Sequence, residues 1–328
     1  MAISKIIFPL IVFSVAIDPA MARLQQYQAD LTSSDWVLTK ESPLVCKMEH
    51  QIPLLGRASF ESKAGVSNLQ MKLEFLRTPS ISSKAKLFAV PPIYKAGKSP
   101  SYIADVNVVA GFDTSFNQQQ SWAALIELEQ GNNPTLYFNK GAYAGNNVEV
   151  MLNSANFGSG YDEFLTCVGQ LLPYGYADVE QTVLNYQSNT DELDLESLRR
   201  LHRLVDYLYY DQAITKISIG AYSDSYGGRW HNSELSKTRA NAIKKFMQEA
   251  GINPELVVAV GHGESKHIAS NEDQLGRAQN RRVVIQLTRD ESFDEKMKLP
   301  SNRRLYNERV KQKVMEVKST ESKELAKS

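Results

Sequence analysis

The chain has 328 residues, of which 42% are hydrophobic and 23% are charged. This length and apolar content are sufficient for two domains with separate hydrophobic cores. The 37 basic side chains balance the 37 acidic ones, which excludes a strong overall field toward nucleic acid or an anionic membrane, so recognition must depend on local sites.

The N-terminus has the organisation of a secretory signal peptide. Lys5 precedes the apolar run 6–17, and Ala20-Met21-Ala22 provides the small-x-small pattern of a cleavage site. We therefore expect residues 1–22 to be removed on export. The alternative is an interfacial anchor, because the run is too short to span a bilayer of about 30 Å as a helix.

Residues 23–176 have the pattern of an all-β domain. Short alternating or aliphatic runs are separated by clusters of Gly, Pro, Asn and Ser. The predicted strands are residues 44–48, 57–60, 69–75, 86–90, 122–128, 136–138 and 148–152. This spacing indicates a sandwich or a distorted barrel, with loops at Pro91-Pro92 and Pro100.

Two cysteines, Cys46 and Cys167, bracket nearly all of these strands. An even count in an exported chain favours one disulfide bond. The alternative is two buried free thiols, and the absence of a C-x-x-C motif argues against a redox-active pair.

Residues 177–290 alternate between the periods of strands and helices. The predicted strands are residues 183–186, 214–223, 257–260 and 283–287. One predicted helix has an apolar stripe of Leu195, Leu198, His202, Val205 and Leu208, and the next ends at Gly251. This β-α-β-α-β-β order predicts an α+β domain.

The tail, residues 291–328, is dense in charge. It carries ten basic and seven acidic side chains and few apolar ones. This composition predicts a disordered or solvated helical extension.

The second predicted helix of residues 177–290, the one that ends at Gly251, places an arginine within its apolar stripe. At about 100° per residue, Arg239 falls near the centre of the stripe formed by Leu235, Ile243, Phe246 and Ala250. A buried arginine persists only when it is paired and hydrogen-bonded. Arg239 is therefore expected either to be locked to an internal carboxylate or to be held as a rigid fork for an anionic ligand.

The same helix resembles the pattern N-x-x-L-S-x-x-R-A-x-x-V/I of the OmpA-like peptidoglycan-binding domain. The matching positions are Asn232, Leu235, Ser236, Arg239, Ala240 and Ile243. Two further segments fit: Asp224 follows the predicted strand ISIGA, and the run QNRRVVIQL at residues 279–287 resembles the family's last strand. The resemblance implies that the loop after the second strand folds over the start of the following helix.

The ligand of such a domain suggests how its residues act. Diaminopimelate in the peptidoglycan stem peptide carries an ammonium and a carboxylate on one carbon at its free end. Asp224 would take the ammonium and Arg239 the carboxylate, and helix N-terminal amides near Asn232 and Ser233 would add donors. The alternative is an internal Asp224–Arg239 salt bridge without a ligand.

Two further residues are candidates for the rim of this site. Asn189 follows the first strand of the domain, and Arg282 stands in the NRR run. For Arg282 the alternative is that it solvates the start of its strand.

Enzymatic interpretations are weak. The run Gly-His-Gly-Glu-Ser at residues 261–265 lacks the G-x-S-x-G order of a nucleophile elbow and is better explained as a Gly-rich turn. The histidines do not have the spacing of a metal site, and the paired acidic residues are adjacent, unlike a glycosidase dyad. We expect no enzymatic activity, no metal and no cofactor.

Residues 23–290 as a whole resemble the MotY family of periplasmic proteins of the sodium-driven flagellar motor. The N-terminal half contributes Trp36, the segments Pro43-Leu44-x-Cys46 and His50-x-Ile52-Pro53, Gly56-x-Ala58-x-Phe60, Pro91-Pro92, the run Trp122 to Glu129, and Cys167. Two departures are the tail after Asp290 and Tyr94, where the family usually has Trp.

This resemblance implies a division of labour. Residues 23–176 would dock onto the flagellar basal body rings and the companion protein MotX, and residues 177–290 would hold peptidoglycan. The protein would be a periplasmic ring component that supports assembly of the stator complex. The alternative is a generic OmpA-like cell-envelope tether with no flagellar role.

Overall fold

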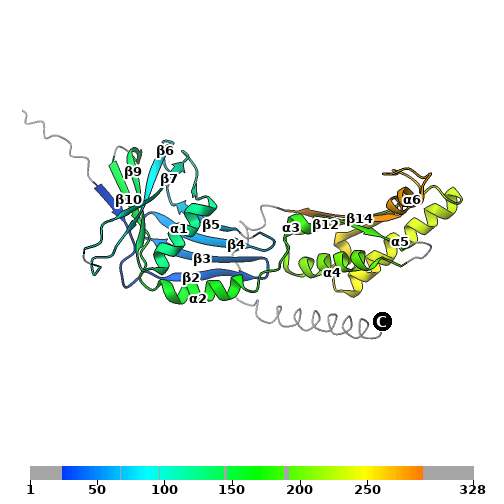
Figure 1. Cartoon of the computed structure of the whole chain (residues 1–328), viewed down its shortest axis with the longest axis horizontal. Coiled ribbons are helices and arrows are strands. Elements are labelled where there is room, and N and C mark those ends of the chain that lie inside the picture. The colour runs from blue at the N-terminus through cyan, green and yellow to red at the C-terminus, as the bar shows by residue number, and fades with distance from the viewer. Residues whose placement is uncertain (1–23, 67, 96, 144–145, 188–191, 291–328) are drawn as a thin grey trace, which may run out of the picture. The chain divides into compact units, whose positions relative to one another are not determined.

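A computed structural model of the chain describes residues 24–66, 68–95, 97–143, 146–187 and 192–290, with side chains omitted for residues 139–146. The predicted signal peptide, the charged tail and Asn189 lie outside the described residues. The chain divides into two compact units. Their segments can be found in Figure 1 by the colour, which runs along the chain by residue number. The first takes in the described residues of Met1–Asp35, His50–Ala58 and Lys72–Phe157; the second takes in those of Trp36–Glu49, Ser59–Met71 and Gly158–Ser328.

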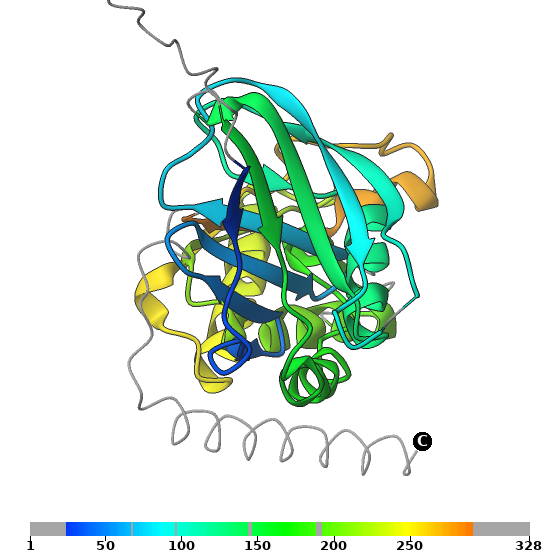
Figure 2. The same cartoon turned by 90° about the vertical axis from the view of Figure 1, so that its left-hand side faces the viewer.

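The first unit contains a five-stranded sheet in the order β1-β10-β9-β6-β7. Its strands are β1 (Leu24–Tyr27), β6 (Ser83–Val90), β7 (Ser101–Val108), β9 (Asn133–Tyr143) and β10 (Asn146–Met151). Figure 2 views this sheet, with β1 in dark blue beside β10 in green; these two strands pair in parallel although about 120 residues of sequence separate them. Alternate residues of β6, Ala85, Leu87 and Ala89, are buried, as expected for a sheet with one face on a core.

A second five-stranded sheet has the order β2-β3-β4-β5-β8. Its strands are β2 (Trp36–Ser42), β3 (Val45–Ile52), β4 (Gly56–Lys63), β5 (Leu69–Phe75) and β8 (Thr114–Ser115). The predicted strands at 44–48, 57–60, 69–75, 86–90, 136–138 and 148–152 are therefore confirmed to within a few residues. The β-rich architecture predicted for this half of the chain is confirmed as two sheets.

The predicted strand at residues 122–128 is wrong, because this segment is part of helix α1 (Gln118–Glu129). Asn117 caps the helix by accepting a hydrogen bond from the Gln120 N–H, and the Gln120 side chain accepts one from the Asn117 backbone N–H, a capping box. The buried residues Ser121, Ala124, Leu125 and Leu128 recur at helical spacing. Trp122 and Ile126, which made the run look like an aliphatic strand, are 46% and 44% exposed.

The disulfide bond between Cys46 and Cys167 is confirmed. Cys46 lies in β3 and Cys167 in helix α2 (Phe157–Val168), with their Cα atoms 5.9 Å apart. Both residues are buried. The bond closes a loop of 121 residues, so it ties the first part of the β-rich region to the helix that follows its last strand.

The C-terminal part of the second unit is an α+β arrangement. Its sheet has the order β11-β14-β12-β13 and comprises β11 (Gln181–Asn185), β12 (Ile214–Ala221), β13 (Val257–Gly261) and β14 (Arg282–Arg289). The helices are α3 (Tyr176–Val179), α4 (Leu195–Tyr210), α5 (Arg229–Glu249), the 3-10 turn η1 (Pro254–Leu256) and α6 (Gln274–Asn280). The predicted α+β class is confirmed; α6 adds a short helix between the last two strands, which the predicted order lacked.

Helices α4 and α5 pack on this sheet through one core. Leu201, Leu204 and Val205 of α4 and Ile243 and Met247 of α5 are buried together with inward-facing residues of the strands. The predicted stripe on α4 is therefore partly wrong: Val205 belongs to the core, but Leu195 and Leu198 are 55% and 37% exposed. None of the described helices combines the length and apolar composition that crossing a bilayer would require.

Candidate functional site

Asp224 lies in the loop that follows β12, and its side chain is 12% exposed. One carboxylate oxygen, Oδ2, accepts a hydrogen bond from Nη1 of Arg281 at 2.9 Å, and the other, Oδ1, accepts one from the Tyr226 N–H at 3.1 Å. The sequence left open an internal salt bridge between Asp224 and Arg239. The structure gives Asp224 an internal salt bridge, but its cation is Arg281.

Asn232 holds this loop against helix α5. Asn232 is only 2% exposed. Its Nδ2 donates to the carbonyls of Asp224 and Tyr226, each at 3.3 Å, and to the Glu264 carboxylate at 3.2 Å. The loop after the second strand therefore folds over the start of the following helix, as the resemblance implied. A second side chain, Ser236, accepts from the Gly263 N–H at 2.8 Å and fixes the turn after β13.

The start of α5 corrects one expectation. The helix begins at Arg229, one turn before the predicted N-terminus, and the Asn232 N–H already donates to the Gly228 carbonyl at 3.0 Å. The amide of Asn232 is thus part of the helical ladder and is not a donor at the helix end. Asn232 acts through its side chain instead.

Arg239 is buried within the apolar stripe, as predicted, with 5% of its surface exposed. Its guanidinium carbon lies over the ring of Tyr186, 4.2 Å from the centroid, and this cation–π contact supports the planar head group. Asn232, Ser236, Arg239 and Ile243 are all buried, so they share the inner face of the helix.

Arg239 lies on the same face of α5 as Asn232, the residue that contacts the Asp224 loop. Arg239 follows Asn232 by seven residues, about 10 Å along the axis at 1.5 Å per residue. Helical side chains lean toward the N-terminus, which is the direction of the turn in which Asn232 contacts Asp224.

Arg282 is held by contacts within the domain. It is 6% exposed, its Nη2 donates to the Lys266 carbonyl at 3.0 Å, and its guanidinium lies 4.2 Å from the centroid of Tyr222. Tyr222 in turn stacks on His262 at 4.8 Å. Burial lowers the pKa of the Arg282 guanidinium from its ordinary value. With so little exposure it does not solvate the start of its strand; it fastens the segment between β13 and β14, and its place at the rim of the ligand site stays a prediction.

Three residues next to the site were not predicted from the sequence. They are Arg281, Glu264 and Tyr186. The NRR run signalled two arginines, but adjacent residues at the start of a strand point in opposite directions, and only Arg281 reaches Asp224. Glu264 belongs to the predicted Gly-rich turn; hydrogen bonds from Asn232 and then from Arg229 lower the pKa of its carboxyl.

The inner site carries charged groups of both signs. Asp224 is paired with Arg281, and Arg239 adds a buried guanidinium on the inner face of α5. The Asp224 carboxylate has accepting capacity beyond its two hydrogen bonds, so a ligand ammonium can add to it. In the described part of the chain no group of three His, Cys, Asp or Glu residues is placed to hold a metal ion.

Comparisons with known proteins place these observations in two families. A family model of the MotY N-terminal domain matches residues 27–173, and the model of the OmpA family matches residues 185–281. The chain is thus of the class in which an OmpA-family domain follows a MotY N-terminal domain. Both families consist of non-enzymatic structural proteins.

One relative extends over most of the chain. The sodium-type flagellar protein MotY of Vibrio parahaemolyticus serotype O3:K6 is 31% identical over 266 residues, which are 81% of this chain and 91% of that protein. The chain belongs to the MotY family of flagellar proteins.

Other similar proteins match shorter parts of the chain. Outer membrane porin F of Pseudomonas fluorescens is 39% identical over 69 residues, which are 21% of each chain. The solved structure of the peptidoglycan-associated lipoprotein from Burkholderia pseudomallei is 22% identical, covers 33% of this chain and 90% of that chain, and has a TM-score of 0.31.

Proposed function

We propose that this protein is a periplasmic structural component of the flagellar motor, which anchors a ring around the basal body to peptidoglycan and supports assembly of the stator complex. The observation that carries the proposal is the union of a MotY N-terminal domain with an OmpA-family domain in a single chain. Residues 23–176 would dock onto the basal body rings and MotX, and residues 177–290 would bind the cell wall. The predicted signal peptide supports the periplasmic location.

The anchor would bind the zwitterionic end of diaminopimelate in the stem peptide. The Asp224 carboxylate would accept from the ammonium, and the Arg239 guanidinium would donate to the carboxylate. Both groups are largely buried, and contacts between charges are stronger in such surroundings than in water. Asn232 would position the Asp224 loop through its Nδ2, which donates to three acceptors, and its side chain stays a predicted contributor to ligand binding. Arg282 and Asn189 remain predicted contributors to the rim.

The peptidoglycan assignment is tested by co-sedimentation of the purified protein with sacculi. Asp224→Ala and Arg239→Ala should each weaken binding by about ten- to a hundredfold, since a charge-assisted hydrogen bond contributes about 1.5 to 3 kcal/mol. Lys245→Ala is the matched control, because this exposed residue lies on the same helix and pairs with Glu249. Full binding by both site variants would refute the anchor, and melting curves must show that the variants remain folded.

The motor assignment is tested in a strain that lacks the protein. We expect filaments of normal length on cells that do not swim, because the proposed role concerns the stator and not export or filament assembly. Normal swimming would favour the alternative of a generic OmpA-like tether, and loss of filaments would contradict both. Turnover of sacculi by the purified protein would instead identify an enzyme.

A further inference from the structure

The outer edge of β11 carries backbone groups that point out of the sheet. In the antiparallel pair of β11 and β14, the Leu287 N–H donates to the Glu180 carbonyl, and the register pairs Thr182 with Ile285 and Leu184 with Val283. Residues 180, 182 and 184 therefore face β14, since hydrogen-bonding direction alternates along a strand. The N–H and C=O groups of Gln181, Val183 and Asn185 face outward, and within the described residues β11 is an edge strand of its sheet.

The far end of this edge is closed by the start of α4. The Asn185 N–H donates to Ser197 Oγ at 2.8 Å, and the Asn185 carbonyl accepts from the Asp194 N–H at 3.1 Å. The Val183 carbonyl accepts from Nη1 of Arg200 at 3.4 Å, which is a long and weak contact. These three contacts confirm the outward direction of the odd-numbered residues. They leave a stretch of only three residues, 181–183, between α3 and the start of α4.

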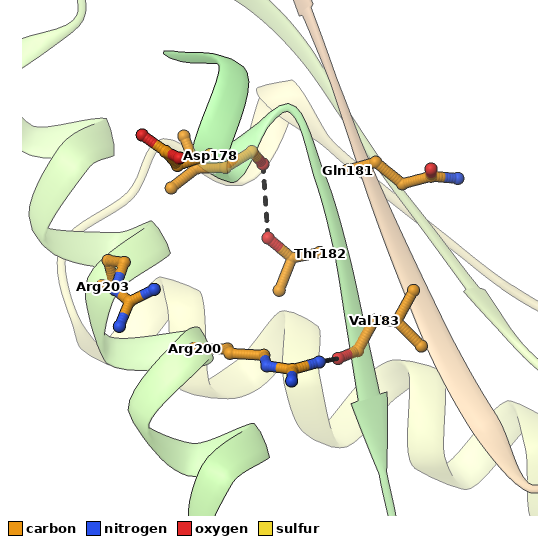
Figure 3. Close-up of a pocket in the computed structure, with 7 residues that line it drawn as sticks. Asp178, Gln181, Thr182, Val183, Arg200 and Arg203 are labelled. Carbon is orange, nitrogen blue, oxygen red and sulfur yellow. Dashed lines mark hydrogen bonds between the residues drawn. The ribbon is translucent and has the colours of Figure 1, made fainter. Parts of the chain in front are cut away.

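A recess of about 210 Å³ lies along this open stretch. It is lined by Asp178, Val179, Gln181, Thr182, Val183, Arg200 and Arg203. Figure 3 shows the two arginines projecting from α4 beside β11, with Arg200 reaching the Val183 carbonyl. Thr182 Oγ1 donates to the Val179 carbonyl at 3.3 Å, so this hydroxyl closes the α3 end of the recess.

The charge of the recess is carried by guanidinium groups. Arg203 lies with its guanidinium carbon 5.4 Å from the centroid of the Tyr174 ring, and the Tyr174 hydroxyl donates to Asp206 at 2.6 Å. Arg200 is bound through Nε to Glu196 at 3.2 Å. The lining carboxylate, Asp178, accepts from the Gly175 N–H at 2.8 Å and so caps α3. The recess thus combines outward backbone donors and acceptors with two cationic forks, which suit a carboxylate.

We propose that this recess receives the carboxyl-terminal end of an extended peptide from a partner protein. The last residues of that peptide pair with the outward backbone groups of Gln181 and Val183, as in other cases of strand addition. The terminal carboxylate lies on Arg203 and displaces Arg200 from its weak contact with Val183. A chain end fits better than an internal segment, because the open edge spans three residues and is closed at both sides. This partner site uses none of the residues proposed to hold peptidoglycan.

The proposal is tested by NMR titration of the ¹⁵N-labelled mature chain. The probes are the acetylated pentapeptide Ser-Thr-Val-Thr-Val with a free terminal carboxylate and the same peptide with a terminal amide. We expect the largest shifts at the N–H groups of Gln181 and Val183, and smaller ones at Thr182 and Leu184, whose N–H groups face β14. The free acid should bind at least about tenfold more tightly than the amide, which lacks the charge-assisted contact.

Variants separate the carboxylate contact from the backbone contact. Arg203→Gln should reduce the affinity for the free acid to that for the amide, while Arg199→Gln, an exposed neighbour on α4, should leave both unchanged. Gln181→Pro should weaken both peptides by removing an outward donor, and a proline is tolerated at the first residue of an edge strand. Equal binding of acid and amide, equal effects of the two arginine variants, or no saturable shift at Gln181 and Val183 would each overturn the proposal.

Discussion

The two halves of the chain differ in what they bury. In the described residues of 24–173 the buried carboxylate is that of Glu149, which accepts from Gln26 and Tyr137. Among the described residues of 181–289, four charged groups are buried: Asp211, Asp224, Arg239 and Arg282. The first region therefore buries mostly uncharged polar side chains and adds a disulfide bond, whereas the second holds several charged side chains in its interior. The ligand site proposed for the OmpA-family region can be described by individual residues for this reason.

The largest expected effect concerns the disulfide bond. In the Cys46→Ser and Cys167→Ser double variant, closure of the 121-residue loop is lost, which should lower the free energy of unfolding by about 4 to 5 kcal/mol in the chain-entropy model. Regional hydrogen exchange should show faster opening in residues 24–173. Trp36, which is buried against Phe60 at 5.8 Å, provides a fluorescence signal for the same region.

The contrast between the halves would fail if exchange in residues 181–289 accelerated equally. The unaltered protein should yield no free thiol when it is denatured without reductant. Two reactive thiols per chain would contradict the bond itself.

A smaller effect is expected from the ion pair of the polar network. Arg281→Gln leaves the Asp224 carboxylate, whose side chain is 12% exposed, without its cation, and should cost about 3 kcal/mol in the free energy of unfolding. Asp224→Asn in the same chain should recover part of this loss, because the unpaired charge is then absent. Urea unfolding of the two single variants and the double variant measures the coupling, and strictly additive losses would show that the pair contributes nothing.

Asn232→Ala should have a smaller effect still. It removes three hydrogen bonds of 3.2 to 3.3 Å, but two of the acceptors are loop carbonyls that water can reach once the loop relaxes. We expect a loss of about 1 to 2 kcal/mol and weaker sacculus binding, because the Asp224 loop is no longer fixed. Thr238→Ala, on the exposed side of the same helix, is the control for the change in side-chain size, and an equal loss there would remove the special role of Asn232.

The sequence correctly predicted the strands and helices whose pattern of apolar residues had an unambiguous period. Alternating runs such as Ile217, Ile219 and Ala221 formed strands with those side chains buried. The segment at 122–128 was assigned wrongly because Trp122 and Ile126 add exposed apolar residues to a helical pattern, which makes the run resemble a buried strand. The Asn117 and Gln120 capping pair was the signal that distinguished the two, and it depends on residues just before the run.

The site was predicted in part for a similar reason. Arg239 stood out because a charge within an apolar stripe conflicts with its surroundings, and its burial follows from the helical period. For an internal pair the sequence offered Arg239 as the partner of Asp224; that Arg281 takes this place depends on where α6 ends and β14 begins, which the sequence pattern does not fix. Tyr186 escaped attention because an aromatic residue after a strand has no distinct pattern; its role becomes visible only through the 4.2 Å contact with Arg239.

The smallest predicted effect is a loss of folding stability at acidic pH, which we expect from one histidine in each half of the chain. Burial lowers the pKa of His50 and of His262 from the ordinary value of 6.5, so the folded protein holds both rings neutral. As the pH falls below about 6.5, the unfolded chain binds protons that the folded chain does not, and stability is lost toward the lowered pKa. The effect should be larger for His50, which is fully buried with Nδ1 3.1 Å from the Asp35 carbonyl, than for the half-buried His262.

This comparison is made by urea unfolding at pH 7.5 and 5.5. His50→Gln keeps a donor for the Asp35 carbonyl and should reduce the loss of stability at the lower pH, with the difference concentrated in residues 24–173. His262→Phe retains an aromatic ring for the stack on Tyr222 and should reduce the loss less. If both variants lose as much stability on acidification as the unaltered protein, the pH dependence arises from carboxyl groups and the two buried rings do not contribute to it.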